Sequence, residues 1–261
     1  MGWSKEFLEN QRKERLKEIN VNRQGYSMKV IEYYDSRNMI IEFQDEYKTK
    51  IRCAYKEFKN GGIKNPNHKT VEGVGYMGIG EYSYTTNPES YKKWCDMIIR
   101  CYNPYELNKH PTYIDCYIED EMLCYQNFAK WYEENYYEIP NEALELDKDI
   151  LYKGNKIYSK NTMILVPHRI NCLFTKSNKM RGEYPIGVNY YKKYNCLVVR
   201  CQTLEKKVFL GYFSLNEPFK AFTTYKNFKE NYIKKVADEY KELIPIELYE
   251  AMYRYEVEIN D

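Results

Sequence analysis

The chain has 261 residues, of which 43% are hydrophobic and 30% charged, and its formal net charge at pH 7 is +2. This length suffices for one large domain or for two to three small ones. The N-terminal stretch MGWSKEFLENQRKERLKEI is charged throughout, and no window approaches the roughly 18 apolar residues of a membrane span. We therefore expect a cytoplasmic protein without a signal peptide or a membrane segment.

Cysteine usage argues against a structural metal. The eight cysteines include no C-x-x-C pair, and only three histidines accompany them. This spacing gives no support to a tetrahedral zinc site, so we interpret the cysteines as free thiols in a reducing compartment.

Charge is unevenly distributed along the chain. Residues 176–235 contain 13 Lys or Arg and 4 Glu, whereas residues 104–151 contain 3 Lys and 12 Asp or Glu. The local balances are therefore +9 and −9. A basic segment of this kind favours contact with phosphate, and an acidic one favours solvent, a cation or a basic protein surface.

The first third of the chain predicts a helix and a small β structure. Residues 4–19 have a thin apolar stripe among basic side chains, which is typical of an exposed helix. The alternating runs SMKVIEYY and NMIIEF flank the turn-prone DSR, so we expect a β-hairpin, followed by a third strand over residues 47–54. The glycine-rich GVGYMGIG that follows is interpreted as a linker.

The middle of the chain predicts two helices and then a strand–loop–strand–helix pattern. Apolar residues recur at helical spacing over residues 90–102 and again over residues 121–136. Beyond them an apolar strand ends at Asp147, a polar loop follows, a second strand restarts at Asn161, and Asn171 lies on an expected helix.

The last part changes to strands. The runs YPIGVNYY, NCLVVRCQT and KKVFLGYFS are separated by turn-like breaks, and a long helix is expected from Asn216 to about Leu243. In the middle run, Val198, Arg200 and Gln202 alternate with apolar residues, so one face can be buried while the other presents polar groups.

Two stretches resemble known families. The AP2 DNA-binding domain of phage and mobile-element proteins is similar to the stretch that begins at Arg181, RGEYPIGV and LVVRCQTLEKKVFLGYFSLNEPFKAFTTYKNFKENYI. Phage HNH homing-endonuclease-type proteins are similar to WCDMIIRCYNPYELNKHPTYIDCYIEDEMLCYQNFAKWY with LDKDILYKGNKIYS. The two together cover most of residues 90–240, and their combination is more specific than either one.

The expected fold is α+β with several modules. They are a basic N-terminal helix (1–24), a small β module (25–72), a linker (73–89), an HNH-like ββα-metal module (90–175), an AP2-like domain of three strands and a helix (176–245), and a C-terminal tail (246–261).

The AP2 resemblance implies that the three-stranded sheet enters the major groove of double-stranded DNA while the helix braces its rear face. The residues expected to contact DNA are Arg181, Lys192, Lys193, Arg200, Gln202, Lys206 and Lys207.

The HNH resemblance implies a site for Mg²⁺ or another divalent cation. In such a site an acid ends the first strand and binds the metal, the next residue is a general-base histidine, and a helix residue completes the shell. Here Asp147 and Asn171 take the ligand positions, Asn161 takes that of the structural loop asparagine, and Lys148 stands where the base belongs. A surface lysine with the usual pKa of about 10.4 is charged and cannot accept a proton. Acidic neighbours would raise its pKa further.

Three other residues are candidates to complete the site. His168 lies three residues before Asn171 on the expected helix, and His110 lies in the HPTY stretch, so either could serve as the base. Asp149 could join Asp147 as a second carboxylate, because alternation along a strand puts both on one side.

Two functions remain open. One is a phage-type homing or nicking endonuclease that finds its site with the AP2-like sheet. The other is a catalytically inactive relative in the host cytoplasm, which acts as a DNA-binding regulator or as an anti-CRISPR-like inhibitor of a host DNA-targeting defence complex. The position of Lys148 and the acidic segment favour the second function.

Overall fold

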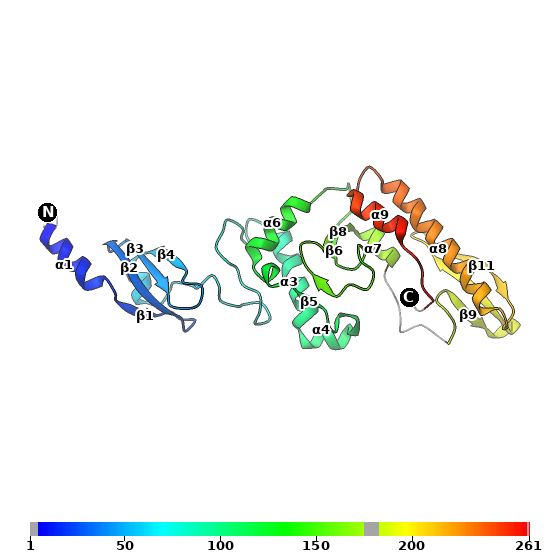
Figure 1. Cartoon of the computed structure of the whole chain (residues 1–261), viewed down its shortest axis with the longest axis horizontal. Coiled ribbons are helices and arrows are strands. Elements are labelled where there is room, and N and C mark those ends of the chain that lie inside the picture. Colours follow the sequence, from blue (N-terminus) through cyan, green and yellow to red (C-terminus); the bar gives the residue numbers. More distant parts are fainter. Residues whose placement is uncertain (1–4, 175–182, 260) are drawn as a thin grey trace. The chain divides into compact units, whose positions relative to one another are not determined.

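The computed structural model describes residues 5–174, 183–259 and 261. The fold is α+β, with several small antiparallel sheets and one parallel strand pair among helices (Figure 1). Within the described residues, no helix combines the length and apolar character that a membrane crossing requires. Arg181 lies outside the described residues.

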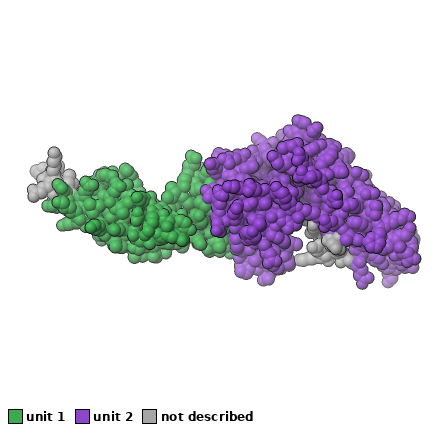
Figure 2. Space-filling model, in the orientation of Figure 1, with its two compact units in different colours: residues 1–88, 123–126 green, residues 89–122, 127–261 purple. Residues whose placement is uncertain are grey.

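The chain divides into two compact units, coloured separately in Figure 2. Unit 1 comprises residues 1–88 and 123–126, and unit 2 comprises residues 89–122 and 127–261. The boundary expected between residues 175 and 176 falls inside unit 2.

Unit 1 contains a four-stranded antiparallel sheet in the order β1-β2-β3-β4. Met28, Val30, Met39 and Ile41 point to one face and are fully buried there, as the alternation of their strands predicts. The hairpin was predicted, whereas β1 and α2 were not. The elements are α1 (Lys5–Arg15), β1 (Ile19–Val21), β2 (Ser27–Asp35), β3 (Asn38–Phe43), β4 (Lys50–Cys53) and α2 (Tyr55–Lys59).

The glycine-rich segment is packed against the rest of unit 1. Tyr76 forms a β-bridge with Cys124. A Cβ added at Gly78 would lie 2.5 Å from the Cys124 sulfur, and one at Gly80 would lie 2.0 Å from Oε1 of Gln126. Gln126 also donates through Nε2 to the carbonyl of Met77 at 3.2 Å. These glycines therefore allow a close backbone approach.

The segment from residue 88 to residue 135, most of which belongs to unit 2, is mainly helical. The helix expected over residues 90–102 is present as α3, whereas the one expected over residues 121–136 is broken at Cys124 into α5 and α6. The elements are α3 (Pro88–Tyr102), α4 (Pro104–Lys109), the short helix η1 (Pro111–Tyr113), β5 (Tyr117–Ile118), α5 (Asp120–Leu123) and α6 (Tyr125–Asn135).

A strand pair and a helix follow. β6 (Leu144–Asp147) pairs antiparallel with β8 (Ile164–Pro167), and α7 (His168–Phe174) begins directly after β8. β7 (Ile157–Tyr158) lies in the connection and pairs in parallel with β5. The predicted order of strand, loop, strand and helix is thus present, although the second strand begins at Ile164 and not at Asn161.

The C-terminal part contains a three-stranded antiparallel sheet in the order β11-β10-β9, and helix α8 packs on one of its faces (Figure 1). Leu197, Val199 and Cys201 of the middle strand are buried on the α8 side. The elements are β9 (Val188–Tyr191), the short helix η3 (Lys192–Tyr194), β10 (Cys196–Gln202), β11 (Lys207–Phe213), α8 (Pro218–Tyr240) and α9 (Ile246–Arg254).

One hydrophobic core joins the two halves of unit 2. Ile164 and Ile170 of the β8–α7 region belong to the same buried cluster as Ile233 of α8 and Leu248 of α9. The segment expected to be a C-terminal tail is therefore largely a helix that completes this core.

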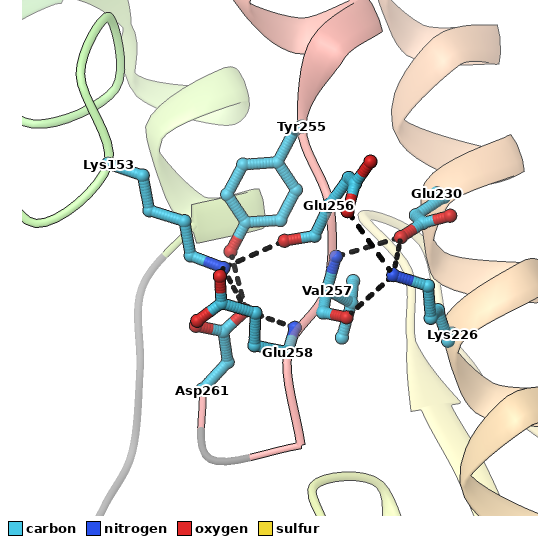
Figure 3. Close-up of polar contacts among 8 residues, drawn as sticks. All are labelled: Lys153, Lys226, Glu230, Tyr255, Glu256, Val257, Glu258 and Asp261. Atoms are coloured by element: carbon cyan, nitrogen blue, oxygen red, sulfur yellow. Dashed lines mark hydrogen bonds and ion pairs between the residues drawn. The ribbon is translucent and has the colours of Figure 1, made fainter.

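The residues after α9 make polar contacts with the loop after β6 on one side and with α8 on the other (Figure 3). Lys153, in the loop after β6, donates to the Glu256 carbonyl and to the Asp261 carboxylate, both at 2.8 Å. On the other side, Lys226 of α8 donates to the Val257 carbonyl at 2.9 Å.

Candidate functional site

A cavity of about 240 Å³ beside β6 and α7 brings most of the predicted catalytic residues together. His110, Asp147, Lys148, Asp149 and Asn171 all line it. His168 lies on α7 but lines a neighbouring cavity, and Asn161 lines neither.

Asp147 is held by the backbone that follows it. Its Oδ1 accepts hydrogen bonds from the amides of Asp149 and Ile150, both at 2.8 Å, which closes a tight turn at the end of β6. Burial, with repulsion from Asp149, raises the pKa of the Asp147 carboxyl, and this outweighs the two backbone bonds and the attraction of Lys148. The neutral acid is therefore favoured more than at an exposed aspartate.

Lys148 is buried, which corrects the expectation of a surface lysine. Its side chain is 8% exposed, and its ammonium lies 3.7 Å from a carboxylate oxygen of Asp149. The same nitrogen lies 5.8 Å from the ring centres of Tyr113 and of Tyr158. The ion pair and the two rings together compensate for the lost hydration of the ammonium.

The expected strand alternation of Asp147 and Asp149 is wrong, because β6 ends at Asp147 and Asp149 lies in the turn. Asp149 instead acts as the counter-ion of Lys148.

Sequence reasoning missed Arg100, a second cation in this cavity. It lies on α3, where a single arginine in an amphipathic helix gives no signal of function. Burial would lower the pKa of its guanidinium, but interactions with the Tyr158 and Tyr113 hydroxyls raise it. Arg100 therefore stays charged beside the carboxylates.

Glu145, also missed, connects β6 to α7. One of its oxygens lies 2.5 Å from Nδ1 of His168, and the other accepts a hydrogen bond from Nδ2 of Asn171. Burial would raise the pKa of Glu145, but these two contacts lower it. His168 and Asn171 do share a helix face, as expected, and Nε2 of His168 lies 3.5 Å from the Cys172 sulfur. Strand alternation could have identified Glu145, which stands two residues before Asp147.

The loop between the strands is braced by Asn155 and not by Asn161. Nδ2 of Asn155 donates to the carbonyls of Lys148 and of Ile157, both at 2.7 Å. Asn161 is exposed in the turn before β8, where its backbone amide donates to the Ser159 hydroxyl at 3.3 Å. The structural role expected for Asn161 therefore belongs to Asn155.

These residues do not fit a divalent cation. Such an ion requires several oxygen ligands, yet in the described part of the chain no three His, Cys, Asp or Glu side chains are grouped to hold a metal. One oxygen of Asp147 is already taken by two amides, and the Asn171 amide faces Glu145. Lys148 and Arg100 add two positive charges to the same cavity.

The second candidate surface is the face of the C-terminal sheet opposite α8. Arg200 is half-buried and Gln202 exposed on this face, as predicted, whereas Val198 is only 2% exposed. Four exposed lysines flank the middle strand, with Lys192 and Lys193 before its first residue and Lys206 and Lys207 after its last.

Aromatic side chains stand on the outer strands of the same sheet, most of them exposed. Tyr191 of β9 and Tyr212 of β11 stack with ring centres 5.9 Å apart, and Phe209 contacts Tyr212 at 4.9 Å. Because the two tyrosines stand on the outer strands, their stacked rings lie over the middle strand. This accounts for the burial of Val198, which is the cross-strand partner of Tyr212.

No family model matches the chain, and neither a curated protein nor a solved structure matches it.

Proposed function

We propose that this protein binds double-stranded DNA through the open face of its C-terminal sheet, and that its ββα module takes part without cutting. The observation that carries the proposal is the arrangement of lysines at both ends of β10, with Arg200 and Gln202 between them. The chain is then an inactive relative of HNH nucleases with an AP2-like DNA reader.

The dimensions of the sheet suit a major groove. β10 has seven residues, which corresponds to roughly 20 Å at the rise of an extended strand. The major groove is about 12 Å wide and admits β-strands. Cations at the two strand ends therefore reach the phosphates on either side while the central side chains face the base edges.

The cavity beside β6 supports the non-cleaving part of the proposal. A metal-dependent nuclease needs a cation and a base that can accept a proton. Here the base position holds a buried ammonium paired with Asp149, and Asp147 is held in a backbone turn. The ammonium group of Lys148 thus lies in the cavity where a metal-dependent nuclease would bind a cation.

DNA binding is tested by the salt dependence of affinity. Fluorescence anisotropy with a labelled duplex should show binding that weakens steeply with salt, and Lys192→Ala and Lys206→Ala should each reduce the log–log slope by about 0.9. Lys235→Ala is the matched control, because Lys235 is an exposed lysine of α8, which covers the opposite face. Equal slopes in all four proteins would contradict the proposal.

A nuclease is the second candidate, because the cavity does bring His110 close to Asp147 and Asn171. A plasmid assay with Mg²⁺ or Mn²⁺ separates the two. We expect the supercoiled DNA to stay intact under conditions where it is bound. Cleavage that His110→Ala or Asp147→Asn abolishes would establish the nuclease instead.

A further inference from the structure

Four aromatic side chains form a continuous cluster on the open face of the C-terminal sheet. Tyr191 and Tyr212 stack on each other, and Phe209 contacts Tyr212. The ring of Tyr194 lies edge-on to both tyrosines, with ring centres 5.3 Å from Tyr191 and 5.8 Å from Tyr212. The Lys193 ammonium lies 5.2 Å from the centre of the Tyr194 ring. We call these four aromatic residues the ring cluster.

Three of the four members of the ring cluster are exposed although they are large aromatic side chains, and Tyr191 is half-buried. Tyr194, Phe209 and Tyr212 are 56%, 53% and 50% exposed. A contiguous apolar patch that is rimmed by charge is typical of a binding surface. Lysines lie at both ends of β10, so the positive charge around the patch favours a polyanionic ligand.

The position of Arg200 indicates which part of a duplex the rings would meet. Arg200 is the cross-strand partner of Phe209, and Val198 that of Tyr212, so the guanidinium and the rings share one stretch of the sheet. In the major groove, arginine recognises the O6 and N7 atoms of guanine, and the apolar feature of the groove is the C5 methyl group of thymine.

We propose that the ring cluster recognises thymine methyl groups in the major groove, next to a guanine contacted by Arg200. This inference rests on the proposed DNA binding and gives it a base preference. Aromatic rings that lie on a sheet present apolar surface to a methyl group without unstacking the bases. Half-exposed rings have area left to bury, which makes the contact favourable.

The test replaces thymine by deoxyuridine, which removes the methyl group and nothing else. Two duplexes of equal length and the same mixed sequence, which contains guanine next to thymine, are compared by fluorescence anisotropy at one salt concentration; in one of them every thymine is replaced by deoxyuridine. We expect the thymine duplex to bind tighter by about fourfold for each methyl group contacted, as the burial of one such group predicts.

Variants assign the preference to the ring cluster. Phe209→Ala and Tyr212→Ala should weaken binding to the thymine duplex and bring the two affinities close together, whereas Tyr212→Phe should keep the preference. Phe219→Ala is the matched control, because Phe219 is 71% exposed on α8. The three side chains changed are half-exposed or more, and thermal unfolding confirms that each variant is folded.

Each outcome decides between the proposals. If the wild-type protein binds neither duplex, the proposed function fails. If it binds both duplexes equally, DNA binding stands and the methyl preference is refuted. Tighter binding to single-stranded oligo(dT) than to either duplex would also refute it, because the rings would then stack on unpaired bases.

Discussion

Replacing Asp147 by Ala or by Asn separates the role of its side chain as a hydrogen-bond acceptor from the effect of its charge. Oδ1 of Asp147 accepts two backbone amides, from Asp149 and from Ile150. Alanine leaves both without an acceptor. The Ile150 amide belongs to a buried residue, whereas Asp149 is exposed and its amide can turn to water. Since an unsatisfied buried donor costs about 1–3 kcal/mol, we expect Asp147→Ala to lower the free energy of unfolding by about 2 kcal/mol.

Asp147→Asn keeps the acceptor and removes the charge. The folded-state pKa of Asp147 is raised above its usual value of about 3.9, so the folded protein binds this proton where the unfolded chain has released it. The stability from this group is present below about pH 4 and is lost as pH rises through the folded-state pKa. The advantage of the Asn variant over wild type should therefore grow with pH across this window, by up to about 1.4 kcal/mol per pH unit.

Urea unfolding at several pH values measures both effects, and the fluorescence of Trp94, which is fully buried in the same unit, reports it. The reasoning is refuted if Asp147→Asn is as unstable at pH 7 as Asp147→Ala. The ionised carboxylate would then be a needed partner of the cavity's cations, and not a group held mainly by the backbone.

Three further outcomes follow from the described contacts. Asn155→Ala should lower the free energy of unfolding by about 2 kcal/mol because two backbone carbonyls lose their donor, whereas the exposed control Asn161→Ala should stay within about 0.5 kcal/mol; similar losses in urea unfolding would contradict this. Cys172 is the exposed member of the eight cysteines, all of them in the described residues, so peptide mass mapping should find it alkylated first by iodoacetamide. Gly187→Ala should markedly lower the melting temperature, because the φ angle of Gly187 is +78° and the added Cβ would lie 2.1 Å from the ring of Tyr225. An unchanged melting temperature would show that this ring moves aside.

Local patterns predicted the regular elements where one face is buried. The alternation in SMKVIEYY and in LVVRCQ gave β2 and β10, and the helical spacing around Trp94 gave α3. β1 was missed because it has three residues and its two end residues are exposed. α9 was missed although IELYEAMYR has helical spacing, because residues 246–261 were interpreted as a tail.

The site was predictable only in part, because its properties come from contacts between distant segments. Lys148 is buried by Tyr113 and Tyr158, and sequence spacing carries no record of those two rings. The bracing role of Asn155 likewise depends on how the loop folds back. The ring cluster of the sheet arises from cross-strand register, which places Tyr212 near Tyr191.

The contacts of Lys153 also set an order of events during synthesis. This side chain meets Asp261, which lies 108 residues further along the chain, and the core beneath it needs Ile233 and Leu248. When the β6–β8 region of a nascent chain has just left the ribosome, Asp261, Ile233 and Leu248 have not yet emerged. Contacts of such long separation form late and slow folding. Unit 2 is therefore expected to reach its native state only when translation has passed α9, so the cavity beside β6 and the C-terminal sheet acquire their native geometry together.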